Sequence, residues 1–358
     1  MPGVTSRADG HRAKAAVAAS ALALLVAGFV LDEYGLTVSA KIFAIAIAVA
    51  GSWLLIGLLG VMSFGQAIFL ASGAGGISGI SGPQRSAAAH GRMTGMDPVP
   101  DDELPEHVVV NRTQWDADAP AWVAAGERAW AARQPTWGVW DVPETTVGLL
   151  PEDMTGMDAI ELGCGTGYVS AWMARRGAIV TAIDNSQRQL ETARRLGTAH
   201  RLDITWIHGN AERVPRPDGS FDFAVSEYGA AIWCDPFVWV PEAHRLLRAG
   251  GVLALLGNHP LALACAPLDG SATSETLVRD WFSLHRIDWR QVETDPSGIE
   301  FTLPTGGWFR LFDRVGFDVI DYQELQARDP GPGKPFGTSA SWAHRFPSEQ
   351  VWKVRKRG

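Results

Sequence analysis

A glycine-rich loop that follows an apolar run is the feature of this sequence most suited to ligand binding. The run 157–162 has the length and composition of a buried strand, and Gly163-Cys164-Gly165-Thr166-Gly167 comes directly after it. Glycines lack a Cβ, so the loop backbone can approach a ligand closely. A helix beginning at residue 168 would also point its first amides toward that ligand. The loop therefore predicts a binding site at the carboxyl end of the strand.

A carboxylate at the end of the next predicted strand strengthens this prediction. The apolar run 178–184 ends in Asp184. The carboxyl ends of parallel strands meet at one edge of a sheet, so Asp184 should lie beside the glycine loop. There it could accept two hydrogen bonds from ribose hydroxyls. The two features together indicate a nucleoside ligand.

The spacing within the loop excludes two common nucleotide ligands. A dinucleotide fingerprint needs a glycine three positions after its second loop glycine, whereas residue 168 is Tyr. A triphosphate-binding loop would continue with Gly-Lys-Ser or Gly-Lys-Thr, and this sequence does not. Glu161, at the loop entrance, would repel a pyrophosphate but attract an ammonium or a sulfonium.

Four ordered motifs resemble those of a known family. Residues 161–167 resemble the first motif of the class I S-adenosylmethionine-dependent methyltransferases, and Asp184 matches the acid that binds ribose in that family. Residues 209–222 resemble the stretch from the adenine-binding turn to the fourth strand, and residues 242–251 resemble the helix and turn before the fifth. The resemblance covers about residues 111–357 and is nearest to the small-molecule type related to quinone-biosynthesis enzymes.

This resemblance implies S-adenosyl-L-methionine as cofactor, no metal, and in-line transfer of a methyl group to a small-molecule acceptor. Asn210 departs from the family pattern, which usually has Asp there. Its amide oxygen could still accept from the adenine amino group, so we expect weaker binding. The residues that the resemblance assigns to the cofactor are Glu161, Gly163, Cys164, Gly165, Thr166, Gly167, Asp184, Asn185, Asn210, Ala211, Glu212 and Ser226.

Two other functions stay open. One is a methyltransferase acting on nucleic acid or protein. DNA amino-methylating relatives carry Asn or Asp, then Pro-Pro and an aromatic residue after the fourth strand, where this chain has Ser226-Glu227-Tyr228-Gly229. The other is a membrane-anchored cofactor-binding module without catalysis.

The sequence names no catalytic base. Tyr228 and His259 are weak candidates, and Glu227, Trp233 and Asp235 also follow the predicted fourth strand. Each has an ordinary structural explanation, such as capping a helix or packing in the core, and a structural or solvent role is favoured for His259.

The order of the predicted elements sets the fold class. Apolar strands alternate with amphipathic helices, which predicts a Rossmann-like, seven-stranded, mostly parallel sheet with helices on both faces. An insertion at 258–306 is predicted to be rich in helix and to form the acceptor side of the pocket. The predicted strands are 157–162, 178–184, 203–209, 221–227 and 250–257, with a sixth within 306–325 and a last within 341–357.

Three tryptophans before the sheet fall on one face of a predicted helix. Trp115, Trp122 and Trp130 are spaced by seven and eight residues, and Pro120 should break or restart that helix. Core packing is the ordinary role of such a stripe, and a lid over a ligand is the alternative. The basic tail 353–357 is expected to be solvated.

The first part of the chain has a different chemistry. Residues 1–84 carry few charges, and the uncharged runs 15–31 and 42–71 predict one or two transmembrane helices. The segment resembles the first spans of branched-chain amino-acid transporter permeases, most closely around Ser63-Phe64-Gly65-Gln66-Ala67. Residues 85–110 form a predicted linker, and residues 111–358 form the methyltransferase domain.

The distribution of charge orients this segment. Basic residues precede the first run and acidic ones follow it, so the positive-inside rule places the domain on the cytoplasmic side of a membrane. A fusion remnant or an upstream start that is absent from the product stays open, in which case the protein would be cytoplasmic. The formal charge of −8 argues against a nucleic-acid partner, and an odd count of three cysteines argues against a disulfide framework. The sequence leaves the oligomeric state open.

Overall fold

The computed structural model describes residues 104–292, 297–330 and 335–358. These residues belong to the compact unit Gly91–Gly358. The predicted membrane segment at 1–84, with its permease-like motif, and most of the predicted linker lie outside the described residues. Within the described ranges, no helix is both long enough and apolar enough to cross a membrane.

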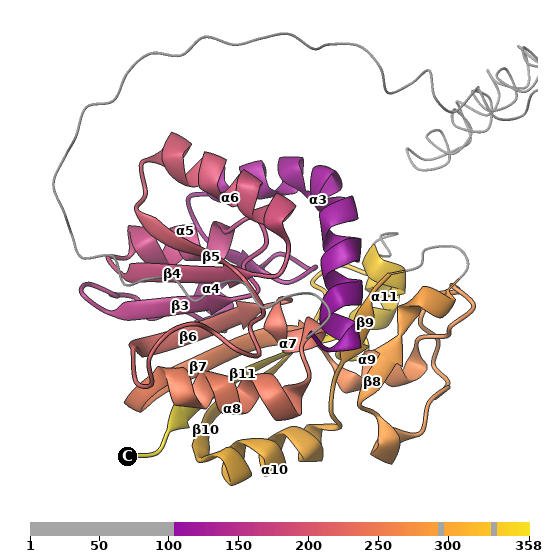
Figure 1. The fold of residues 1–358 in the computed structure, drawn as a ribbon. Helices are drawn as coiled ribbons and strands as arrows, with labels where there is room; N and C mark the ends of the chain where they lie inside the picture. The colour runs from indigo at the N-terminus through magenta and orange to yellow at the C-terminus, as the bar shows by residue number, and fades with distance from the viewer. Residues whose placement is uncertain (1–103, 293–296, 331–334) are drawn as a thin grey trace, which may run out of the picture. The chain divides into compact units, whose positions relative to one another are not determined.

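A seven-stranded sheet forms the centre of this unit (Figure 1). The strand order is β10-β11-β7-β6-β3-β4-β5, in which β7 to β5 are parallel and β11 runs antiparallel to both of its neighbours. The predicted mostly parallel, seven-stranded sheet is therefore confirmed. The strands are β3 (Asp158–Leu162), β4 (Ile179–Asp184), β5 (Ile204–His208), β6 (Phe221–Glu227), β7 (Leu247–Asn258), β10 (Phe317–Leu325) and β11 (Glu349–Lys356).

Helices cover both faces because the sheet has a separate apolar core on each (Figure 1). Ile160 and Leu162 of β3 point to one core, and Ala159 points to the other. The first core packs against α7 (Ala230–Trp233), α8 (Pro236–Leu246) and α10 (Thr305–Val315). The second packs against α4 (Glu144–Val147), α5 (Tyr168–Arg175), α6 (Gln187–His200) and the end of α3 (Glu106–Ala131).

Helix α3 differs from its prediction in two respects. It begins at Glu106, inside the predicted linker, and it continues through Pro120 without a break. A proline removes one backbone hydrogen bond from a helix interior, which destabilises it. Here Pro120 is exposed, and the opposite side of α3 packs against α5, α6 and α7, so tertiary contacts hold the helix together.

The insertion after β7 contains little helix, so that prediction is wrong. It consists of α9 (Pro260–Cys265), short 3₁₀ turns and a β-hairpin of β8 (Arg286–Asp288) with β9 (Ile299–Phe301). A short hairpin, β1 (Thr136–Trp137) with β2 (Val142–Pro143), precedes the sheet, and α11 (Ala340–Ala343) precedes β11. Tertiary packing therefore overrides the helical preference expected for this insertion.

The basic tail is also not simply solvated. Lys353 and Lys356 lie in β11, where their ammonium groups donate to backbone carbonyls of Gly148 and His244 at 2.9 and 2.7 Å. Arg357 pairs with the carboxylates of Asp313 and Asp318. These contacts fasten the last strand to neighbouring elements.

Candidate cofactor and acceptor site

Two loops meet where the strand order reverses, between β3 and β6. Gly163 has φ +78°, and a Cβ there would lie 2.6 Å from the backbone nitrogen of Ala230 and 2.6 Å from Cα of Gly229. A Cβ on Gly229 would in turn lie 2.2 Å from the carbonyl oxygen of Gly163. Ligands in open α/β sheets bind at such a reversal, and here two glycines let the loops touch.

The tip of β4 lies against the same loop. Asp184 accepts hydrogen bonds from the amides of Gly165 and Ser186, both at 2.7 Å. Its carboxylate keeps lone pairs for further donors, because two oxygens offer about four acceptor sites. Burial raises the pKa of Asp184 to about 6. The predicted ribose acceptor therefore lies beside the loop and is ionised at neutral pH.

One pocket collects most of the predicted cofactor residues. Gly165 borders it at φ +51°, with nothing within 4 Å of a Cβ built there, so the loop is open toward the pocket at this residue. Gln189 also lines the pocket, and its buried Oε1 has no hydrogen-bond partner, which suits a ligand that brings a donor. The predicted residues that line the pocket are Glu161, Gly163, Cys164, Gly165, Thr166, Asp184, Asn185, Asn210 and Ala211.

Three predicted cofactor residues are not among those that line the pocket. Gly167 caps α5 in a left-handed conformation, and a Cβ there would meet the ring of Trp206. Ser226 is fully buried, where its hydroxyl donates to the carbonyl of Leu162 and accepts from the amide of Ala231. These residues hold the two loops in place.

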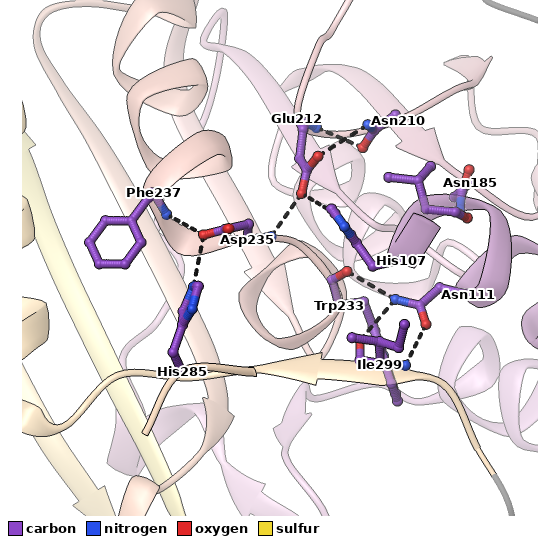
Figure 2. A network of polar contacts seen from close by, with 11 residues as sticks. His107, Asn111, Asn185, Asn210, Glu212, Trp233, Asp235, Phe237, His285 and Ile299 are labelled. Atoms are coloured by element: carbon purple, nitrogen blue, oxygen red, sulfur yellow. Dashed lines mark hydrogen bonds and ion pairs between the residues drawn. The ribbon is translucent and has the colours of Figure 1, made fainter. Parts of the chain in front are cut away.

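Glu212 is the third predicted cofactor residue that does not line the pocket. It links the turn after β5 to helices α3 and α8 (Figure 2). Its Oε1 contacts Nε2 of His107 at 2.7 Å and accepts from the amide of Asp235 at 2.8 Å. Asn210 donates weakly to the other oxygen of Glu212 and accepts from the Glu212 amide at 3.0 Å. The amide oxygen that was expected to meet adenine thus already supports the turn.

Two asparagines join α3 to this site. The amide of Asn111 donates to the carbonyls of Trp233 and Ile299, and its oxygen accepts from the Ile299 amide (Figure 2). Asn185 donates to the carbonyl of Val108 and accepts from Arg112. The first turns of α3 therefore close over the pocket, which the predicted linker boundary did not anticipate.

Glu161 is buried in the pocket wall. It accepts from the backbone amide of Ser170 at 2.7 Å and from the Ser170 hydroxyl. Burial raises the pKa of Glu161 to about 8, with Glu227 and Asp184 adding smaller contributions. A cation in the pocket would favour the ionised form, so this carboxyl suits a positively charged ligand.

The tryptophans of the α3 stripe lie in two different places, of which one is the predicted core. Trp130 is buried, and its indole nitrogen donates to the carbonyl of Thr166 at 2.8 Å. Trp115 and Trp122 line the pocket instead, with ring centroids 5.7 Å apart, and Trp233 lies 5.4 Å from Trp115. These three indoles give the pocket an apolar wall.

The two weak catalytic candidates occupy different places. Tyr228 lines the pocket at φ +52° and donates to Glu349 at 2.6 Å. His259 is not among the lining residues. It caps α9 by accepting from the amide of Leu261, and its other nitrogen contacts Glu324 at 3.2 Å. Asp235 likewise caps α8.

Sequence reasoning missed several residues of the site. Tyr168 and Gln189 line the pocket, and Glu349 contacts Tyr228, which is a lining residue. Tyr168 directly follows the glycine loop, so its position was a usable signal. Nothing in the sequence marks Glu349, which comes after a long separation. In the described part of the chain, no group of three or more His, Cys, Asp or Glu side chains could hold a metal ion.

Comparisons with known proteins find a family model that matches part of the chain. Residues 160–255 match the family model of a methyltransferase domain. This match includes the glycine loop and Asp184, and it supports the resemblance to methyltransferases that the sequence motifs gave. The match begins at residue 160, so the resemblance of residues 1–84 to a permease gains no support from it.

Three similar proteins illustrate the match. A chloroplastic 2-methyl-6-phytyl-1,4-hydroquinone methyltransferase 1 of Oryza sativa subsp. japonica is 36% identical over 108 residues, which make up 29% of this chain and 32% of that protein. A ubiquinone biosynthesis O-methyltransferase of Caulobacter vibrioides is 29% identical, over 44% of this chain and 68% of that protein. A solved S-adenosylmethionine dependent methyltransferase from Mesorhizobium loti is 21% identical with a TM-score of 0.47, over 59% of this chain and 96% of that chain. The chain thus spans about a third of the length of the rice relative.

Proposed function

We propose that this protein is an S-adenosylmethionine-dependent methyltransferase that acts on a small-molecule acceptor. The observation that carries the proposal is the position of Asp184, a half-buried carboxylate with unused lone pairs beside an open glycine loop at the strand reversal. The match of residues 160–255 to a methyltransferase domain supports it, as does the small-molecule chemistry named for the rice and Caulobacter relatives.

Each part of the pocket has a proposed role in this function. Asp184 accepts from the ribose hydroxyls, the turn at Asn210 and Ala211 faces the adenine ring, and Glu161 balances the positive charge of the ligand. When bound, the cofactor supplies a methyl group on a sulfonium, which is a good leaving group. The protein therefore has mainly to orient the acceptor and exclude water, and the indole wall of Trp115 and Trp122 suits this task.

Calorimetric titration with S-adenosylmethionine tests the binding part of the proposal. We expect the native chain to bind, Asp184→Ala to lose most of the affinity, and Asp203→Ala to bind like the native chain. Asp203 is a matched control because it is an exposed acid just before β5. No heat with the native chain would refute the function.

A labelled-methyl assay tests turnover. The native chain with labelled S-adenosylmethionine should label a compound in a metabolite extract, and nucleic acid and protein fractions should stay unlabelled. Label in either of those fractions would favour the alternative class of acceptor. Binding without label in any fraction would favour a cofactor-binding module without catalysis.

We propose in addition that residues 15–71 attach the domain to a membrane with its catalytic part on the cytoplasmic side. The uncharged runs and the basic residues before them support this proposal. The test is whether the full chain sediments with membranes and resists a carbonate wash. Release by carbonate would leave a cytoplasmic enzyme as the alternative.

A further inference from the structure

Two buried glutamates form a polar cluster at the edge of the pocket, apart from the proposed cofactor contacts. Glu227 ends β6 and Glu349 begins β11. Each carboxylate accepts from one tyrosine hydroxyl, which is Tyr168 for Glu227 and Tyr228 for Glu349. Two carboxyl groups are thus matched with two phenol groups, which come from the start of α5, the end of β6 with the residue after it, and the start of β11.

A single turn supplies one backbone amide to each glutamate. Between β1 and β2, the amide of Gly138 donates to Glu227 at 3.1 Å, and the next amide, of Val139, donates to Glu349 at 2.9 Å. Gly138 has φ +69°, and a Cβ there would lie 2.0 Å from an oxygen of Glu349. The close approach therefore requires glycine, which indicates a well-defined arrangement rather than a loose surface contact.

The cluster faces the ligand pocket on one side. Glu227, Tyr168 and Tyr228 all line the pocket that contains Asp184. Tyr228 holds a left-handed conformation at φ +52°, which is unfavourable for a tyrosine and persists only where its surroundings fix it. Strained residues of this kind concentrate at binding and catalytic sites.

Glu349 lacks one of the hydrogen bonds that a buried carboxyl group normally makes. Its side chain is fully buried, and its Oε2 has no hydrogen-bond partner. An unsatisfied buried acceptor costs about 1–3 kcal/mol, and more if the group is charged. A proton on this carboxyl removes its charge and with it part of this cost, so Glu349 and Glu227 together are equipped to hold a proton close to the pocket.

We propose that Glu227 is the catalytic residue that accepts the proton of the methyl acceptor, with Tyr168 as its positioning residue and the Tyr228–Glu349 pair holding the second carboxyl beside it. This inference rests on the proposed methyltransferase function. In the step, a lone pair of the acceptor atom forms the bond to the methyl carbon. The carbon–sulfur bond breaks with its electron pair going to sulfur, and the acceptor's proton passes to the Glu227 carboxylate.

The electrostatic surroundings suit a base of this kind. Burial raises the pKa of Glu227, and hydrogen bonds from Tyr168 and Gly138 limit the rise. The other titratable groups that face it are Glu161 from β3, Glu349 from β11 and Tyr228; burial is the main cause that raises the pKa of each, and repulsion from Glu227 adds to it. A carboxylate whose pKa is raised is a stronger base than a solvated one.

The assignment also restricts the acceptor. A proton acceptor helps only where the methylated atom has a lone pair and also a hydrogen that it must lose, as in a hydroxyl group or a primary or secondary amine. A tertiary amine or a thioether has no such hydrogen. We therefore infer that the acceptor belongs to the first group.

The test compares three variants of the full chain with the native protein. Glu227→Gln removes the base, Glu227→Asp keeps a carboxylate that is retracted from Tyr168, and Tyr168→Phe removes only the hydrogen bond. Glu300→Gln is the matched control, because Glu300 is another buried glutamate with two side-chain donors, Asn258 and Trp289, and does not line the pocket.

Three quantities are measured. Calorimetry gives the affinity for S-adenosylmethionine. Labelled-methyl transfer into the metabolite fraction that the native chain methylates gives the rate, measured from about pH 5 to 9 to bracket carboxyl groups whose pKa is raised by burial. The infrared band of protonated carboxyl groups is titrated over the same pH range without acceptor, and the part of the band that Glu227→Gln loses reports Glu227 independently of turnover.

We expect Glu227→Gln to keep the affinity for S-adenosylmethionine and to lose about 10²- to 10⁴-fold in rate, the range of general-base catalysis. Glu227→Asp should recover part of that loss. Tyr168→Phe should move both the acid limb of the rate profile and the infrared titration to higher pH, because a donor that stabilised the carboxylate is gone. Glu300→Gln should leave the affinity for S-adenosylmethionine and the acid limb of the rate profile unchanged.

Several results would overturn the inference. A Glu227→Gln rate within about threefold of the native rate would refute the base while leaving the methyltransferase function intact, since general bases contribute far more. An unchanged titration in Tyr168→Phe would refute the positioning role. Binding of S-adenosylmethionine without methylation of any fraction would refute the proposed function itself, and the base with it.

Discussion

Replacement of Gly163 by alanine tests whether the contact between the two loops defines the site. The added Cβ would lie 2.6 Å from the backbone of both Gly229 and Ala230, and real Cβ atoms do not come so close to backbone. The left-handed conformation at φ +78° costs alanine about 1–2 kcal/mol, and overpacking against atoms that cannot rotate away costs about 1–3 kcal/mol more. We therefore expect Gly163→Ala to lower the free energy of unfolding by about 2–5 kcal/mol.

Gly165→Ala separates the two contributions. Gly165 also has a positive φ, +51°, but a Cβ there has nothing within 4 Å. This variant should lose only the conformational part, about 1–2 kcal/mol. Both variants are unfolded in urea and followed by tryptophan fluorescence, and their S-adenosylmethionine affinity is measured by calorimetry. Gly163→Ala should also lose S-adenosylmethionine binding, because the two loops must separate to make room for the methyl group of the alanine side chain. Equal losses of unfolding free energy in the two variants would refute the argument.

Three further predictions follow from the carboxyl groups. With a pKa of about 6, Asp184 is ionised at pH 7.5 but mostly protonated at pH 5. Calorimetry should therefore find S-adenosylmethionine bound about tenfold more weakly at pH 5 than at pH 7.5. Equal affinities at the two pH values would contradict the proposed role of Asp184 in binding ribose. Burial raises the pKa of Glu349 to about 7, so the contribution of this carboxyl to the free energy of unfolding is lost as pH rises from about 4.5 to 7. In urea unfolding, Glu349→Gln should flatten the dependence of the free energy of unfolding on pH, and an unchanged slope would contradict this reasoning. Glu212→Ala leaves the Asp235 amide without its acceptor, so it should lower the free energy of unfolding by about 1–3 kcal/mol and weaken S-adenosylmethionine binding. Native affinity in this variant would show that the turn after β5 does not need the contacts of Glu212.

The sequence alone determined the parallel part of the sheet and the side of the pocket that the glycine loop and Asp184 form. Each strand from β3 to β7 is a short apolar run next to an amphipathic helix, and such local patterns survive folding because burial on both faces demands them. The loop at Gly163–Gly167 comes directly after the end of β3, and Asp184 is the last residue of β4. Residues at the ends of adjacent parallel strands must meet, so their proximity follows from the order of the strands alone.

The tertiary structure decided what local patterns cannot express. Helix α3 runs through Pro120 because it packs against other helices, while the insertion after β7 contains a hairpin instead of the predicted helices. His259 became a helix cap and Tyr228 a pocket residue, although both follow strands in the same way along the chain.

Glu349 is the clearest case. It lies 122 residues after Glu227 in the chain, and only the antiparallel return of β11 beside β7, together with the turn at Gly138, brings the two carboxyl groups into one cluster. A single glutamate at the start of a strand carries no signal in the sequence. Glu349 is recognised as a candidate only because its side chain is buried and one of its oxygens lacks a hydrogen-bond partner, and both are properties of the folded chain.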